Sequence, residues 1–152
     1  MAYTTADARQ QLLDTLATAA EELGVALAAL TDAYEQLDEN AAERLERDLF
    51  RPVQAAYGRA QRTHAGFAER HGLPGRAFEP AAAGAPAHGV RGFLTLAVDA
   101  VARADAMLAD LQDSMLPVEV GDPQLRAGIE EVRVLLGRVR TGSRELLRTL
   151  GR

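Results

Sequence analysis

The sequence has no cysteine, no lysine and no tryptophan, so its 17 basic residues are all arginine. The lack of cysteine excludes disulfides, thiol catalysis and cysteine-ligated metal centres, and it fits a reducing compartment. Aromatic residues make up only 5% of the chain, so the core has to consist mainly of leucine and alanine. Both are strong helix formers. The richness in alanine, glycine and arginine indicates a bacterial genome of high GC content.

Long apolar runs and an apolar leader are also missing. No stretch approaches the roughly 20 apolar residues of a membrane span. The first residues, MAYTTADARQQLL, have neither the basic start nor the apolar segment of a signal peptide. We therefore expect a cytoplasmic protein that does not enter a membrane. The net charge of −5 argues against nucleic-acid binding, which requires a basic surface.

Apolar residues recur at alternating steps of three and four along four segments, as in amphipathic helices that pack together. The first such row consists of Leu13, Leu16, Ala20, Leu23, Leu27, Leu30, Tyr34 and Leu37. Strand-like residues are confined to VEV at 118–120. The sequence thus predicts an all-α fold, a single-domain (1–152) up-down-up-down antiparallel four-helix bundle. The predicted helices span roughly 5–38, 41–72, 88–115 and 123–150.

Capping residues and prolines set the predicted helix ends. Asn40, with a glutamate three residues later, resembles a capping box at the start of the second helix. A single helix over 5–50 is the alternative. Pro52 removes a backbone donor and should kink or split the second helix, which Gly72 ends. Asp122, followed by a proline, is the expected N-cap of the fourth helix.

The charge of the four segments favours the same order of helices. Acidic residues predominate in 1–50 and 93–124, and arginine predominates in 51–92 and 125–152. In an up-down-up-down square, every adjacent pair of helices would then be opposite in charge. Ion pairs on a surface select between arrangements more than they stabilise them.

The connection at 73–87 is longer than neighbouring antiparallel helices need. It contains three prolines and two glycines. We interpret it either as a loose loop or as a cap over the end of the bundle, held in place by Phe78.

Two of the three histidines, His64 and His71, lie seven residues apart on the inward row of the second helix. Seven residues of helix span about 10.5 Å. Metal–nitrogen bonds are only about 2.0–2.1 Å long, so one ion could not easily bind both side chains. The Glu-x-x-His pattern of di-iron bundles is also absent, because Gln61 and Ala68 stand three residues before the two histidines.

Two interpretations of His64 stay open. In the first, it is a core histidine bonded to a hydroxyl or a backbone group, and His71 only complements the dipole at the end of its helix. In the second, His64 lines a pocket for a small molecule or a single metal ion, together with His71, Tyr57, Tyr34 and Ser143. We expect Tyr57, Tyr34 and Ser143 to face inward from different helices.

No catalytic motif is recognisable, since GxGxxG, the P-loop, GxSxG and HExxH are all missing. The arginines near the C-terminus form either a solvated face or a site for an anion or an acidic partner: Arg138, Arg140, Arg144, Arg148 and Arg152. The sequence favours a non-enzymatic protein without a cofactor. We expect it to act through protein–protein contacts, with another protein or as a homo-oligomer. The alternative is a bundle that binds a small molecule or a metal ion near His64.

Overall fold

The computed structural model describes residues 4–79 and 89–150, and all regular secondary structure within them is helical. The elements in chain order are α1 (Thr5–Glu35), α2 (Glu39–Leu45), the π-helix η1 (Glu46–Phe50), α3 (Arg51–Arg70), α4 (Gly89–Asp113), α5 (Leu116–Glu119) and α6 (Pro123–Leu150). The predicted all-α class is confirmed, and the VEV stretch begins inside α5. None of these described helices is long and apolar enough to cross a membrane.

The turn between α1 and α2 lies slightly earlier than predicted. The expected N-cap at Asn40 is wrong. The side chain of Asp38 accepts a hydrogen bond of 2.9 Å from the backbone N–H of Ala41, so α2 begins at Glu39. Aspartate at an N-cap satisfies one of the donors that a helix start leaves free. The break also rules out the alternative of one continuous helix.

The helix that follows changes its winding just before Pro52. In η1 the N–H of Arg51 donates to the carbonyl of Glu46, five residues back. Leu45 and Leu49 form one apolar row, whereas a different row begins at Phe50 and Val53. The π-turn accounts for this slip, because it holds one residue more than an α-turn. The helix continues as α3 with Pro52 in its first turn, where a proline is tolerated. The predicted disturbance at Pro52 therefore takes the form of a π-turn.

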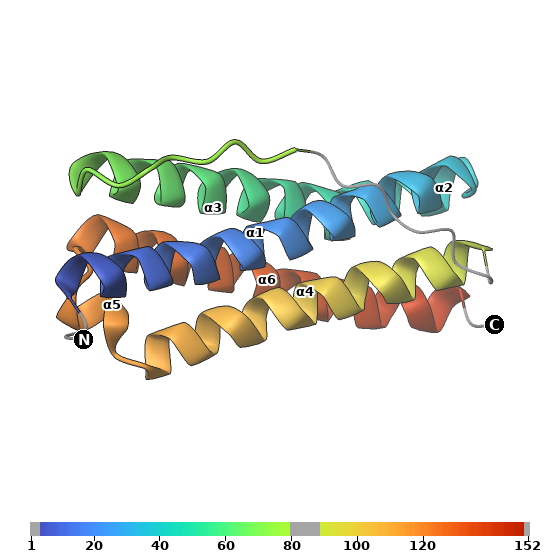
Figure 1. Cartoon of the computed structure of the whole chain (residues 1–152). Helices are drawn as coiled ribbons and strands as arrows, with labels where there is room; N and C mark the ends of the chain where they lie inside the picture. The colour runs from blue at the N-terminus through green and yellow to red at the C-terminus, as the bar shows by residue number, and fades with distance from the viewer. Residues whose placement is uncertain (1–3, 80–88, 151–152) are drawn as a thin grey trace.

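Each long helix packs against two others, in pairs that differ from those predicted. α1 packs against α3 and α4, and α6 packs against the same two helices. The end of α1 meets the start of α4, where Gln36 lies beside Gly89. The end of α3 meets the start of α6, where Arg70 is paired with Asp122. Figure 1 shows α3 and α4 running in one direction and α1 and α6 in the other. The predicted up-down-up-down order is therefore wrong, because the directions along the chain are up-down-down-up.

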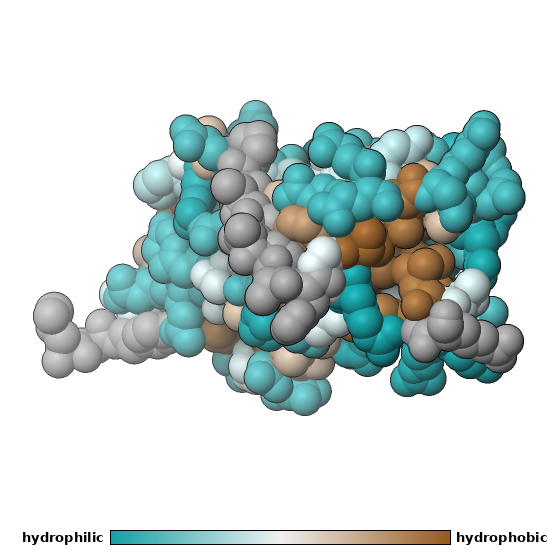
Figure 2. All heavy atoms as spheres, turned by 90° about the vertical axis from the view of Figure 1, so that its right-hand side faces the viewer, coloured by the Kyte–Doolittle hydropathy of each residue, from teal (hydrophilic) through white to brown (hydrophobic). Residues whose placement is uncertain are grey.

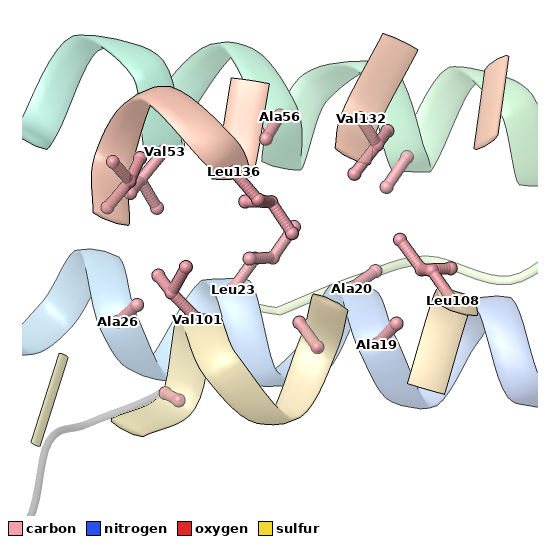
Figure 3. Packing of buried hydrophobic residues seen from close by; sticks show 14 of the residues in the cluster. Ala19, Ala20, Leu23, Ala26, Val53, Ala56, Val101, Leu108, Val132 and Leu136 are labelled. Atoms are coloured by element: carbon pink, nitrogen blue, oxygen red, sulfur yellow. The ribbon is translucent and has the colours of Figure 1, made fainter. Parts of the chain in front are cut away.

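Close packing of small side chains explains why the charge pattern misled the prediction. The most extensive contact joins α1 and α4, which are both acidic. These two helices bury a large set of alanines: Ala8, Ala17, Ala19, Ala20, Ala26, Ala29, Ala33, Ala97, Ala100 and Ala104. At the centre of the core, Leu23 of α1 and Leu136 of α6 point toward one another (Figure 3). Exposed ion pairs contribute less than about 1 kcal/mol each, so packing decides which helices become neighbours.

The order of the helices also explains the long connection after α3. Because α3 and α4 run in the same direction, the chain has to return along the molecule between them. A helix of the length of α4 spans about 37 Å at 1.5 Å per residue, whereas an extended chain covers about 3.3 Å per residue. Residues 73–79 run back along the side of α3 and α1 (Figure 1). Phe78 therefore lies on the side of the molecule and not over its end. Residues 80–87 of the predicted loop lie outside the described residues.

Candidate functional site

His64 is buried in α3, and only 3% of its surface is exposed. Its Nδ1 has no hydrogen-bond partner among the described residues. The ring of Phe78 stands edge-on to the imidazole, with 5.5 Å between the ring centroids. Burial lowers the pKa of His64, and the negative charge of Asp14 opposes this only in part. Nδ1 of His64 therefore lacks the hydroxyl or backbone partner that the first interpretation requires.

Phe78 belongs to the segment 73–79, which is tied down beside His64. Arg76 forms an ion pair with Glu21 of α1, and its guanidinium lies 5.5 Å from the centroid of the Phe78 ring. Leu73 and Phe78 both pack against the apolar core. The segment therefore acts as a strap over the groove between α1 and α3.

A cleft of about 400 Å³ opens beside this strap. Its lining comes from α1, α3 and the strap, and it consists of Glu21, Val25, Tyr57, Arg76, Ala77, Phe78 and Glu79. Tyr57 is half-buried and lies against Gly24, whose missing side chain leaves room for the ring. Of the five predicted site residues, the structure brings only His64 and Tyr57 to the same groove.

His71 serves a different contact, at the junction of α3 and α6. Its Nε2 lies 3.0 Å from Oδ2 of Asp122. Arg70 donates two further hydrogen bonds of 2.8 and 2.9 Å to the same carboxylate. Oδ1 of Asp122 also accepts from the N–H of Leu125, 2.8 Å away, and so caps α6. Burial alone would raise the pKa of Asp122, but these hydrogen bonds hold it well below its usual range.

Tyr34 and Ser143 do not join the groove of His64. Tyr34 is 45% exposed, so its expected inward position is wrong. In the last turn of α1 it is Ala33 that faces the core, so the neighbouring Tyr34 points away from it. Ser143 is buried, but its hydroxyl donates to the carbonyl of Arg140 in its own helix. Ser143 lies near the C-terminal end of α6, whereas the part of α3 that holds His64 packs near the N-terminal end of α6, at Gly128.

Metal ligands are not gathered at any of these positions. Within residues 4–79 and 89–150, no three histidine, aspartate or glutamate side chains lie close enough to hold an ion. Histidine and carboxylates are the only metal ligands of high affinity that this chain offers, since it lacks cysteine. The groove of His64 therefore lacks a cluster of three such ligands within the described chain.

The structure reveals one buried charged group that the sequence reasoning missed. Asp105 of α4 is only 6% exposed, and it accepts hydrogen bonds from Arg133 at 2.9 Å and from Arg140 at 2.6 Å. The two arginines lie seven residues apart, so they project from the same face of α6. This spacing, combined with an acidic residue beside an apolar row, is the signal that could have identified the cluster.

The remaining arginines near the C-terminus do not form one patch. Arg148 pairs with Glu145. Arg138 lines an open groove of about 660 Å³ between α6 and the α2–η1 segment, with Arg44 and Arg47 on the opposite wall. Arg152 lies outside the described residues.

An apolar surface covers the end of the molecule where α1 ends and α4 begins. Figure 2 looks onto this end and shows hydrophobic residues exposed between hydrophilic ones. Partly buried apolar side chains reach it from the α1–α2 turn, the first two turns of α4 and the last turn of α6. They are Leu37, Val90, Phe93, Leu147 and Leu150. We refer to this surface as the open end.

Comparison of the chain with family models, with curated proteins and with solved structures gave no match.

Proposed function

We propose that the chain is a four-helix bundle without enzymatic activity that acts through protein–protein contacts, by pairing end to end with a second copy of itself. The observation that carries this proposal is the open end, where apolar side chains from three segments stay partly exposed. Contiguous apolar surface of this kind marks interaction sites in proteins that are otherwise polar outside. The lack of cysteine is in keeping with a role in a bacterial cytoplasm.

The charges around the open end support a second copy as the partner. On the side of α1 and α2 lie Glu35, Glu39 and Glu43, which are exposed and form no ion pair with another described residue. On the side of α4 and α6 lie Arg91 and Arg144, which are also exposed and outside every ion pair of the described chain. A two-fold axis that lies in the plane of the interface, along the line between the acidic and the basic side, would place the acidic side of one copy against the basic side of the other. Isologous interfaces are self-complementary in this sense.

The size of the open end sets the expected affinity. Each helix is about 10 Å across, so four helices side by side present roughly 400–600 Å² at their ends. A typical stable interface buries about 800 Å² on each partner. We therefore expect a weak dimer that forms and dissociates with concentration.

Sedimentation velocity over a range of protein concentrations tests the proposal. The wild-type chain should shift from monomer to dimer, and Val90→Glu should raise the dissociation constant at least tenfold. A glutamate in the first turn of α4 is favourable to the helix dipole, so this variant should fold. Val134→Glu is the matched control, because Val134 is 49% exposed on the side of α6 and lies away from the open end.

A charge exchange tests the two-fold arrangement separately. Glu39→Arg and Arg144→Glu should each weaken self-association, because each places like charges opposite one another in both halves of the interface. An equimolar mixture of the two variants should recover dimers, since every contact in the mixed pair joins opposite charges. A wild-type chain that stays monomeric at all concentrations would contradict the proposal.

A further inference from the structure

The side chain of His64 is a polar group that the fold buries without satisfying. It is 97% removed from solvent, and its Nδ1 has no partner in the part of the chain that the structure describes. A buried polar atom without a hydrogen bond is costly, and most such atoms in folded proteins have a partner. The missing partner points to a ligand that supplies one.

The ring that covers His64 does not come from a helix. Phe78 sits on the strap 73–79, and its ring contacts the imidazole edge-on. The strap is held from outside by the ion pair of Arg76 with Glu21, in which both side chains are 49% exposed. Exposed ion pairs are weak, so this contact can be released at little cost. The packing of Leu73 and Phe78 against the core then remains to hold the ring over His64, and a ligand ring that packs in the same way can replace it.

The space next to Phe78 is large enough for a small molecule. The adjoining cleft of about 400 Å³ falls in the range of roughly 300–1,000 Å³ that is common for ligand pockets. Beside Phe78, Tyr57 gives it an aromatic wall and Val25 an aliphatic one, and the charged residues Glu21, Arg76 and Glu79 complete the lining together with Ala77. A planar aromatic ring that carries one polar group suits a lining of this mixed kind.

We propose that the position of the Phe78 ring is a binding site for a small aromatic alcohol of the phenol class. The ring of the ligand takes the place of the Phe78 ring between α1 and α3, and its hydroxyl donates a hydrogen bond to Nδ1 of His64. The imidazole accepts at Nδ1 when it is neutral with its proton on Nε2. The lowered pKa of His64 keeps the ring in this neutral form near pH 7. This inference does not depend on pairing through the open end, which lies elsewhere.

Phenol and toluene, titrated by calorimetry, separate the hydrogen bond from simple filling of space. The two molecules have nearly the same shape, but only phenol can donate to His64. In Phe78→Ala, which empties the site, phenol should bind at least tenfold more tightly than it binds to the wild-type chain. In the same variant phenol should also bind at least tenfold more tightly than toluene. Adding His64→Leu should remove the preference for phenol while toluene binding remains.

Phe93→Ala is the matched control, because it removes another partly buried phenylalanine, and the rings that contact His64 do not include it. It should show no preference for phenol. Should Phe78→Ala fail to fold, nitrogen-15 NMR of the wild-type chain provides the second measurement. Phenol, but not toluene, should then shift the Nδ1 resonance of His64. Equal binding of phenol and toluene to Phe78→Ala, binding of neither, or an Nδ1 signal that phenol leaves unchanged would overturn the inference.

Discussion

α6 approaches α3 closely at Gly128, and replacing this glycine with alanine tests how much the fold depends on that approach. An added Cβ would lie 2.7 Å from Cγ2 of Thr63 and still closer to its Oγ1. Thr63 cannot easily turn away, because it is buried, β-branched and bonded through Oγ1 to the carbonyl of Arg59 at 2.7 Å. The helices would have to separate, and overpacking of this kind costs about 1–3 kcal/mol.

The same helix contains a matched control in Gly137, since no atom lies within 4 Å of the position of an added Cβ there. Both substitutions replace a glycine inside α6 and should gain about 0.5–1 kcal/mol from helix propensity. The gain from helix propensity is therefore the same in both variants, and the difference in stability between them reports the packing at Gly128. Gly137→Ala should be more stable than wild type, and Gly128→Ala should be less stable than Gly137→Ala by about 1–3 kcal/mol.

Urea unfolding followed by far-ultraviolet circular dichroism measures this difference and does not need the tryptophan that the chain lacks. In a thermal melt, each 1 kcal/mol should correspond to about 2–4 °C for a chain of this size. Adding Thr63→Ala to Gly128→Ala should recover most of the loss, because it removes the two atoms that collide. If Gly128→Ala proves as stable as Gly137→Ala, the close approach of α3 and α6 described here is refuted.

Three further predictions concern buried or paired charges and can be checked by the same unfolding assay. Asp105→Ala removes two charge-assisted hydrogen bonds from α6 and should cost about 2 kcal/mol, whereas Glu145→Ala, at an exposed pair, should cost less than about 1 kcal/mol. The pKa of Asp122 is lowered in the folded state, so its contribution to stability is present above about pH 4 and is lost as the pH falls. Asp122→Asn should therefore lose less stability than wild type between about pH 4 and 2. The pKa of His64 is also lowered on folding, so wild type loses stability as the pH falls below about 6.5. His64→Leu should gain more relative to wild type at about pH 5 than at about pH 7.5, and an equal gain at both would contradict the burial of a neutral imidazole.

Much of the fold could be predicted because it depends on local rules. The spacing of apolar residues predicts helices, and α6 begins as expected, with Asp122 accepting from the N–H of Leu125. The slip of the apolar row near Pro52 was visible in the sequence, although its cause, the π-turn over Glu46–Phe50, was not. These features involve residues that are close together along the chain.

The order of the helices could not be predicted in this way, because it depends on which distant surfaces fit together. Charge favoured one arrangement, but the buried alanines of α1 and α4 decided for another. The length of the 73–87 connection was a usable signal, since a chain that joins two parallel helices must run back along them.

The candidate site shows the same limit. Tyr57 and His64 are one heptad apart on one helix, so their common groove followed from helical spacing. The covering ring of Phe78 comes from a segment without periodicity, and no sequence rule placed it there. Ser143 is buried, as expected. It lies near the C-terminal end of α6, however, too far along the helix axis to share a pocket with His64.

The order of the helices has a consequence for how the chain can be divided. The described residues form two halves, 4–79 with α1 to α3 and 89–150 with α4 to α6, and the two most extensive contacts, α1 with α4 and α3 with α6, both join one half to the other. Each half alone would leave the larger part of its apolar surface in water. Two separately produced fragments should therefore be unfolded apart and should assemble when mixed, in a bimolecular step whose rate depends on fragment concentration. In the intact chain the same contacts have a large sequence separation, so we expect folding to be slower than in helical proteins whose contacts are mainly local.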